Sequence, residues 1–416
     1  MWTSMGSYTG TWSPMANIIT ALSYTRCSQM TGDVGMRRKG LEMYQNALVS
    51  IRTALYKKST KFAPDTILAI GIMSIYEALE DATGIKGETH SSAFVNLIQL
   101  MGPKAMVDDP IHDIFCICRV HAICQALQHR RSTFFSQQDW LTLPFNGRQK
   151  GNYNLLTDLV AELCTYLEAG DILDSTASST SSSASPPIAP LRARISLQKA
   201  CLSLQTRFKT WSTRAETLAE FPTPKYMDQE TARAGSLDSR ANATASFYIP
   251  LEFDKFETAE TYLLYWTACL MLLQVLKSNN CALVELVLKS ASLDVSLSST
   301  SASSTFPSRE KSRYSIPDST VDDFDMATSI AASMEYCLRQ DNGLFGVGPV
   351  ILPLNTAMAW FESQPSCWQR LKWCRDLLQL MPFIQAGQLF RGLRVSRIAV
   401  KGEGDERVPV VIEEVC

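Results

Sequence analysis

Apolar residues recur every three or four positions through the first half of the chain, with polar residues between them. Such spacing places the apolar side chains along one side of a helix. It is seen first at Leu41, Tyr44, Leu48, Ile51 and Leu55. It predicts further helices over residues 65–79, 91–101, 111–131 and 153–169, and Gly170 is a typical residue to end the last of them.

The second half of the chain begins after residues 175–190, a Ser, Thr, Ala and Pro tract with almost nothing to bury. Such a tract does not offset the entropy of ordering, which predicts a flexible linker. Helices are predicted beyond it over residues 191–220, 256–277, 281–289, 324–340, 351–361 and 368–380, with a break at Pro382.

These patterns predict an all-α protein, an irregular bundle or superhelix of antiparallel helices with no significant sheet. Only residues 408–415 have β-like composition. The expected organisation, in chain order, is a poorly ordered segment 1–30, a helical half 31–174, the linker 175–190, a second helical half 191–395 with a disordered Ser-rich loop near 290–320, and a tail 396–416.

The amino-acid composition says little more about the fold, but it excludes several classes of function. The 416 residues are 46% hydrophobic and 19% charged, which is enough apolar material for a large core. A formal charge of −2 gives no excess of Lys and Arg for phosphate backbones, so no direct DNA contact is expected from this chain. The first 25 residues lack the pattern of a secretory signal, and the apolar run 262–276 is shorter than a bilayer span. We therefore expect no membrane association and a nuclear or cytoplasmic location.

The sequence contains few patterns that are typical of catalysis or cofactor binding, and we expect no catalytic, cofactor or metal-binding residues. The common phosphate-loop, serine-hydrolase and zinc-protease motifs are missing. Cys118, His121 and Cys124 share one helical face and could hold zinc, but three ligands from one helix are crowded. The twelve cysteines are spread along apolar stretches, which favours reduced core thiols.

The order of several segments resembles the fungal-specific transcription factor domain, the regulatory domain of the fungal six-cysteine zinc-cluster factors. The matching segments are residues 44–55 (YQNALVSIRTAL), 65–79 (DTILAIGIMSIYEAL), 89–103 (THSSAFVNLIQLMGP), 115–132 (FCICRVHAICQALQHRRS) and 140–145 (WLTLPF). Residues 260–274 and 334–361 are similar to its second half, so the resemblance runs from about residue 15 through most of the chain. The positions that match the family pattern are Tyr44, Tyr76, Glu77, His90, Gly102, Pro103, Arg119, Arg131, Trp140 and Pro144.

The resemblance implies a transcription regulator in the nucleus, controlling a biosynthetic, secondary-metabolism or nutrient gene cluster through protein partners such as co-regulators or another transcription factor. A small-molecule effector is a candidate ligand. The chain departs from the family in its zinc cluster, because Cys27 is the only cysteine before Cys116. Contact with DNA must then come from elsewhere. The alternatives are an adaptor that does not bind DNA, and a pathway enzyme or small-molecule binder on the same helical fold.

Two sets of residues are candidate site residues. The first are polar members of apolar helices, which we expect to be buried and paired as structural residues: Glu77, His90, Arg119 and Arg131. The second are aromatic residues of the second half, expected to line a pocket between helices: Tyr262, Trp266, Trp360 and Phe361.

Overall fold

The computed structural model describes residues 13–80, 88–179, 188–217, 221–227, 249–297, 320–339, 342 and 348–385. Helices make up 83% of these residues, and the only sheet within these ranges has two short strands. The all-α prediction is confirmed.

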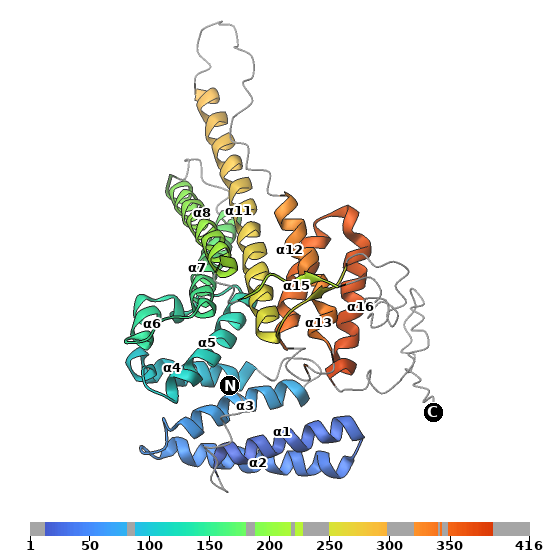
Figure 1. The fold of residues 1–416 in the computed structure, drawn as a ribbon. Helices are drawn as coiled ribbons and strands as arrows, with labels where there is room; N and C mark the ends of the chain where they lie inside the picture. The colour runs from blue at the N-terminus through green and yellow to red at the C-terminus, as the bar shows by residue number, and fades with distance from the viewer. Residues whose placement is uncertain are drawn as a thin grey trace, which may run out of the picture.

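The N-terminal helices form the lower layer in Figure 1. Two of them make an antiparallel hairpin, α1 (Pro14–Thr31) and α2 (Val34–Tyr56), and the next two are α3 (Pro64–Glu80) and α4 (Glu88–Met101). Gly32, in the left-handed region at φ 73°, ends α1, and the Asp33 side chain accepts hydrogen bonds from two amides that begin α2. A tight helix-to-helix turn results.

The helix α1 departs from the expectation that residues 1–30 are poorly ordered. Met15, Ile18 and Ala21 have no exposed surface, because their three-residue spacing directs them together toward α2 and α3. Their burial offsets the ordering entropy of the helix. Residues 1–12 lie outside the described part of the chain.

The longest described helix, α11 (Phe256–Leu297), runs through the body and projects beyond it (Figure 1). Its neighbours on one side are α7 (Asn152–Ser179) and α8 (Ile188–Thr217), and on the other α12 (Thr320–Ala332) and α15 (Ile351–Glu362). Shorter or peripheral elements are α5 (Ile111–Gln128), α6 (Gln138–Thr142), α13 (Met334–Cys337), α16 (Trp368–Gln385), β1 (Lys225–Tyr226) and its antiparallel partner β2 (Leu251–Glu252). Each helix thus contacts close sequence neighbours, and α11 joins the two halves.

The sequence predicted two helices, 256–277 and 281–289, where the structure has the single helix α11 of 42 residues. Asn279 lies where the break was expected and is only 2% exposed. Its Nδ2 donates to Arg194 O at 3.0 Å and to Gln198 Oε1 at 2.8 Å, both on α8. Since α8 satisfies this amide, Asn279 has no need to break the helix by bonding its own backbone.

Three other predicted boundaries also differ. The helix α7 continues past Gly170 to Ser179, because Leu173 packs on the core and Asp174 pairs with Arg194 on α8 at 2.9 Å. The predicted helix 324–340 is divided at Ser333, and α16 extends past Pro382. The predicted linker and Ser-rich loop are helical as far as 179 and 297, and residues 180–187, 298–319 and 396–416 lie outside the described ranges.

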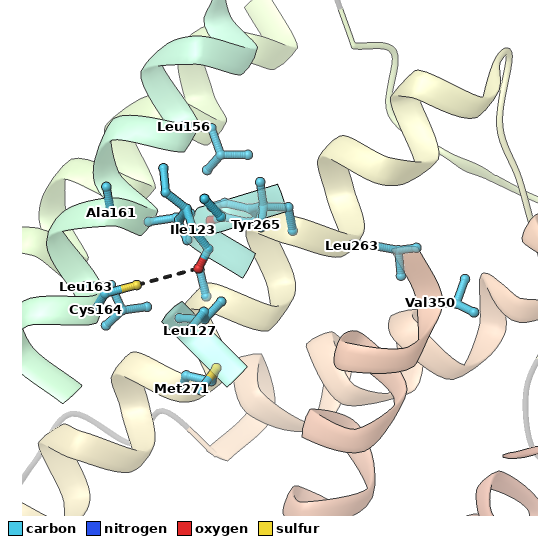
Figure 2. Close-up of a cluster of buried hydrophobic side chains, with 14 of the residues drawn as sticks. Ile123, Leu127, Leu156, Ala161, Leu163, Cys164, Leu263, Tyr265, Met271 and Val350 are labelled. Carbon is cyan, nitrogen blue, oxygen red and sulfur yellow. Dashed lines mark hydrogen bonds between the residues drawn. The ribbon is translucent and has the colours of Figure 1, made fainter. Parts of the chain in front are cut away.

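The core between α5, α7 and α11 is continuous and apolar. Figure 2 shows Ile123 and Leu127 of α5 facing Leu156, Leu163 and other residues of α7. The Cys164 thiol donates to the carbonyl oxygen of Ile123, with a sulfur–oxygen distance of 3.8 Å. This core fixes α11 against the N-terminal half.

One described helix is long and apolar enough to cross a membrane, the segment 256–288 within α11. In its most apolar window, 83% of the residues are buried against the rest of the protein. A core helix has this property.

Candidate functional site

A pocket of about 360 Å³ lies where α11, α12 and α15 meet the turn at Pro365–Cys367. Its size is within the range of small-molecule sites in proteins. Seven residues line it: Lys277, Asp323, Phe324, Trp360, Gln364, Ser366 and Cys367. Because they come from three helices and a turn, the pocket exists only when these elements are packed.

The charged groups of the pocket are Lys277 on α11 and Asp323 on α12. Lys277 Nζ donates to Asp323 Oδ2, forming an ion pair between two residues 46 positions apart. The Asp323 side chain has no exposed surface, whereas that of Lys277 is 44% exposed. A carboxylate taken out of water needs such a partner, so the pair holds α12 to α11 and leaves the pocket nearly neutral.

Two buried polar atoms of the lining residues have no hydrogen-bond partner among the described residues. They are Asp323 Oδ1, an acceptor, and Trp360 Nε1, a donor. Each such atom costs roughly 1–3 kcal/mol relative to its hydrated state. Because neither atom has solvent-accessible surface, both are buried within the walls and out of reach of a ligand in the pocket.

The two aromatic rings that line the pocket, Phe324 and Trp360, are held in place by neighbouring side chains. Trp360 packs edge-to-face on Phe324 at 5.9 Å and on Phe361 at 5.7 Å, measured between ring centroids. The guanidinium of Arg370 lies 5.0 Å from the centre of the Phe324 ring. Cation–π and edge-to-face contacts fix ring orientation, so the wall is already formed without a ligand.

Of the four aromatic residues expected to line a pocket, the structure places two at this pocket and two elsewhere. Trp360 lines it, and Phe361, with no exposed surface, packs edge-to-face against Trp360. Tyr262 donates its hydroxyl to Phe221 O at 3.2 Å, and Trp266 packs on Tyr262 with centroids 5.3 Å apart. Since Tyr262 and Lys277 are 15 positions apart on one helix, they lie roughly 22 Å apart along its axis. Tyr262 and Trp266 therefore lie away from this pocket.

Arg119 is buried and paired in the structure. Its side chain has no exposed surface, and Nη2 donates to Asp158 Oδ1 at 2.8 Å and to Asn154 O at 3.0 Å. The guanidinium lies 5.6 Å from the ring centre of Phe115 and 5.3 Å from that of Phe145. Burial lowers the pKa of Arg119, opposed by the charge of Asp158. This residue joins α5 to α7.

Arg131, expected to be buried, is instead at the surface. Its side chain is 75% exposed, and Nη1 lies 3.8 Å from Glu168 Oε1. It follows the end of α5 at Gln128, where the chain turns outward through Arg130 at φ 52°. The helix thus ends before the position at which the predicted periodicity would have turned Arg131 inward.

Glu77 is half-buried and accepts a hydrogen bond from the Tyr44 hydroxyl at 2.6 Å. His90 lies in the first turn of α4, and its side chain lies outside the described part of the structure. Among the described residues no group of three or more His, Cys, Asp or Glu could hold a metal ion. His121 is exposed, while burial raises the pKa of Cys124 to about 12.

A second feature is Glu260, a half-buried residue on α11. Burial raises its pKa to about 7, helped by the charge of Glu257. Its charge acts in turn on Cys124, Tyr153 and Cys337, raising their pKa values. A carboxyl group that titrates near neutrality can act as acid or base, but Glu260 does not line the pocket between α11, α12 and α15.

Comparison with known proteins identifies no relative: no family model, no curated protein and no solved structure matches this chain.

Proposed function

We propose that this chain is a transcription regulator whose helical body resembles the regulatory domain of fungal zinc-cluster factors. It acts in the nucleus through protein partners, which supply the contact with DNA, and it responds to a small molecule bound in the pocket between α11, α12 and α15.

The observation that carries the proposal is that residues of the family pattern contact one another. Tyr44, of the Tyr-x-x-Ala-Leu helix, stacks on Tyr76 with ring centroids 4.5 Å apart and bonds to Glu77. Tyr76 and Glu77 are the Tyr-Glu pair that ends the long apolar helix of the pattern. These positions lie 33 apart in sequence and meet where α2 packs on α3, so the first two segments of the pattern form one structural unit in this chain.

The Arg-bearing helix and the Trp-x-x-x-Pro-Phe segment of the pattern also contact each other. Arg119 lies against the ring of Phe145, and Phe115 stacks with Trp140 at 6.1 Å between centroids. These segments therefore form one packed aromatic cluster around a buried cation.

The test is to tag the full chain in its native host, delete the gene in parallel, and measure transcripts and chromatin occupancy. We expect a defined gene set to change on deletion, and the tagged protein to occupy the promoters of those genes. Occupancy should be lost when a DNA-binding partner recovered with it is removed. Unchanged transcripts together with a cytoplasmic tagged protein would overturn the proposal.

The pocket also favours a second candidate, a small-molecule binder of a biosynthetic pathway with no role in transcription. Its aromatic wall of Phe324 and Trp360 supports ligand binding whether or not the chain regulates genes. Accumulation of a pathway intermediate in the deletion strain, with transcripts unchanged, would identify this alternative.

A further inference from the structure

We propose that residues 402–416 of this chain dock on the exposed side of α2, with their acidic side chains against Arg38 and Arg52 and their apolar side chains against Leu41 and Leu48. Three features carry this docking: an exposed apolar row on α2, the positive charges at both ends of that row, and the sequence of residues 402–416. Docking of this segment is independent of the proposed function.

The apolar row on α2 is exposed because α2 turns its small residues toward α1. Gly40 and Ala47 are buried, and a Cβ added at Gly40 would lie only 2.5 Å from Thr25 Oγ1 on α1. This close approach leaves Leu41 and Leu48 uncovered, although the sequence predicts both on the apolar side of the helix. They are 51% and 37% exposed. The apolar side predicted for this helix is therefore only partly covered.

The row consists of Val34, Leu41 and Leu48, which follow one another at intervals of seven positions. Seven residues make nearly two helical turns, so these side chains lie in line along α2 at intervals of roughly 10 Å. Val34 is 77% exposed. Figure 1 shows α2 at the lower edge of the described helices, below α3. Single apolar residues are normal on a surface, whereas a row of them along one helix is typical of a contact site.

The charges at the two ends of the row are positive. Arg38 lies three positions before Leu41, and Arg52 lies four positions after Leu48, so both share the side of the row. Both arginines are exposed, and neither pairs with an acidic side chain among the described residues. A second copy of α2 would bring arginines against arginines, which is unfavourable. The charges therefore favour an occupant that is both acidic and apolar.

Residues 402–416, GEGDERVPVVIEEVC, have this composition. They include five acidic residues and one basic residue, and the acidic residues lie on both sides of the apolar run 408–412. Among the parts of the chain outside the described ranges, this segment has the largest excess of acidic residues, whereas residues 386–401 are basic. Pro409 and its neighbouring valines favour an extended backbone over a helix.

The lengths of the two elements agree. Arg38 and Arg52 are 14 positions apart on one helix, which is roughly 21 Å along its axis. In an extended chain, Glu406 and Glu413 would be roughly 23 Å apart, because each residue advances about 3.3 Å. Both acidic ends can therefore pair with arginines at the same time, while the apolar run between them covers the row.

The connecting chain is long enough for this contact. Residues 386–401 join α16 to the segment, and sixteen residues can span up to about 55 Å. A folded body of this size has a radius of gyration of roughly 20 Å. Because the segment is tethered, its effective concentration at α2 is high, and a weak contact suffices for docking.

Hydroxyl-radical footprinting of the full chain tests the docking, because it measures the oxidation rates of Leu41 and Leu48. The neutral variant changes four acidic residues together: Asp405→Asn, Glu406→Gln, Glu413→Gln and Glu414→Gln. Loss of their charge should release the segment, so both leucines should be oxidised about twofold faster or more than in the wild type. The matched control is Leu202 on α8, which is 47% exposed and whose rate should not change.

An exchange of charges tests the pairing itself. Arg38→Glu with Arg52→Glu should release the segment, and Glu406→Arg with Glu413→Arg should do the same. All four substitutions together restore opposite charges, so the oxidation rates of the two leucines should return toward those of the wild type, whichever way the segment runs. If the arginine variant does not fold, as judged by circular dichroism, the neutral variant decides, because its changes lie outside the described residues.

Equal oxidation rates of Leu41 and Leu48 in the wild type and the neutral variant overturn the proposal, as does a charge exchange that fails to restore the rates. Two further results overturn it by showing another occupant. Rates that fall with protein concentration in both proteins alike assign the row to a second copy. Rates that fall only when vesicles containing anionic phospholipid are added assign it to a membrane surface.

Discussion

Tyr44 and Glu77 are joined by a hydrogen bond of 2.6 Å from the phenol hydroxyl to Oε1, which ties α2 to α3. The Tyr44 ring also lies nearly parallel to that of Tyr76, at an interplanar angle of 13°. The α1–α2 hairpin is therefore held to the rest of the protein by a polar contact as well as by burial.

Removing this hydrogen bond should weaken the fold. Tyr44→Phe keeps the ring stack and leaves the Glu77 carboxylate without its phenol partner, so the free energy of unfolding should fall by about 1–2 kcal/mol. The free energy of unfolding is measured by urea denaturation. Tyr56→Phe on the same helix is the control, since Tyr56 is 79% exposed and its substitution should change little.

The same contact predicts an alkaline pH dependence. Burial and the Glu77 carboxylate raise the pKa of Tyr44 above its ordinary value of 10.0, so the folded state favours the neutral phenol. Its contribution is complete below pH 10 and is lost as the pH rises through the raised folded pKa. Urea titrations between about pH 9 and 11 should show a smaller loss of stability in Tyr44→Phe than in the wild type.

Arg119 and Arg131 should behave oppositely although the sequence predicted both to be buried. Arg119→Ala leaves the Asp158 carboxylate without one of its partners in a largely buried site, so it should cost about 3–5 kcal/mol or prevent folding. Arg131→Ala removes an exposed side chain, so it should cost less than about 0.5 kcal/mol. Equal midpoints of thermal unfolding for the two variants would contradict the structure.

Thiol reactivity should distinguish two cysteines from the rest of those described. Cys27 and Cys281 are exposed, and the other nine described cysteines are buried or half-buried. Burial raises the pKa of Cys164 and Cys201 to about 12, so little reactive thiolate forms at pH 8.

The measurement is titration of the native Cys416→Ser protein with an aromatic disulfide reagent, because Cys416 lies outside the described residues. We expect two rapid equivalents, and none in a variant that also carries Cys27→Ser and Cys281→Ser. A third rapid equivalent in the native protein would contradict the burial of the other thiols.

Glu260 should make the protein less stable as the pH rises from about 4.5 to about 7. Burial raises its folded pKa from 4.5 to about 7, so above pH 4.5 the unfolded state ionises more readily than the folded state. Glu260→Gln removes this penalty and should stabilise the protein by about 1–3 kcal/mol at pH 8. At pH 4 the two proteins should be equally stable, and a pH-independent difference would contradict the raised pKa of Glu260.

The sequence was sufficient for most helices because their apolar spacing is local. The helix predicted over 65–79 is α3, and the helices predicted at 351–361 and 368–380 correspond to α15 and α16. Errors fell at helix ends and breaks. The predicted break near 278–280 is missing because Arg194 and Gln198, about eighty positions away, satisfy Asn279.

At the candidate site, too, some residues could be predicted from the sequence and others could not. Trp360 could be predicted as a pocket residue from its place on an aromatic-rich helix, whereas nothing in the sequence indicated Lys277, Asp323 or Gln364. Lys277 and Asp323 are separated by 46 positions and meet only when α12 packs against α11.

The sequence by itself determined that this chain is helical and where most of its helices lie. The tertiary structure decided which polar residues are buried, that α11 is one helix, and that a pocket lies between α11, α12 and α15. The physical reason is the distance along the sequence over which each kind of interaction acts. Helix periodicity and caps act over a few residues, whereas ion pairs, side-chain satisfaction and cavities depend on contacts between helices that are far apart along the chain.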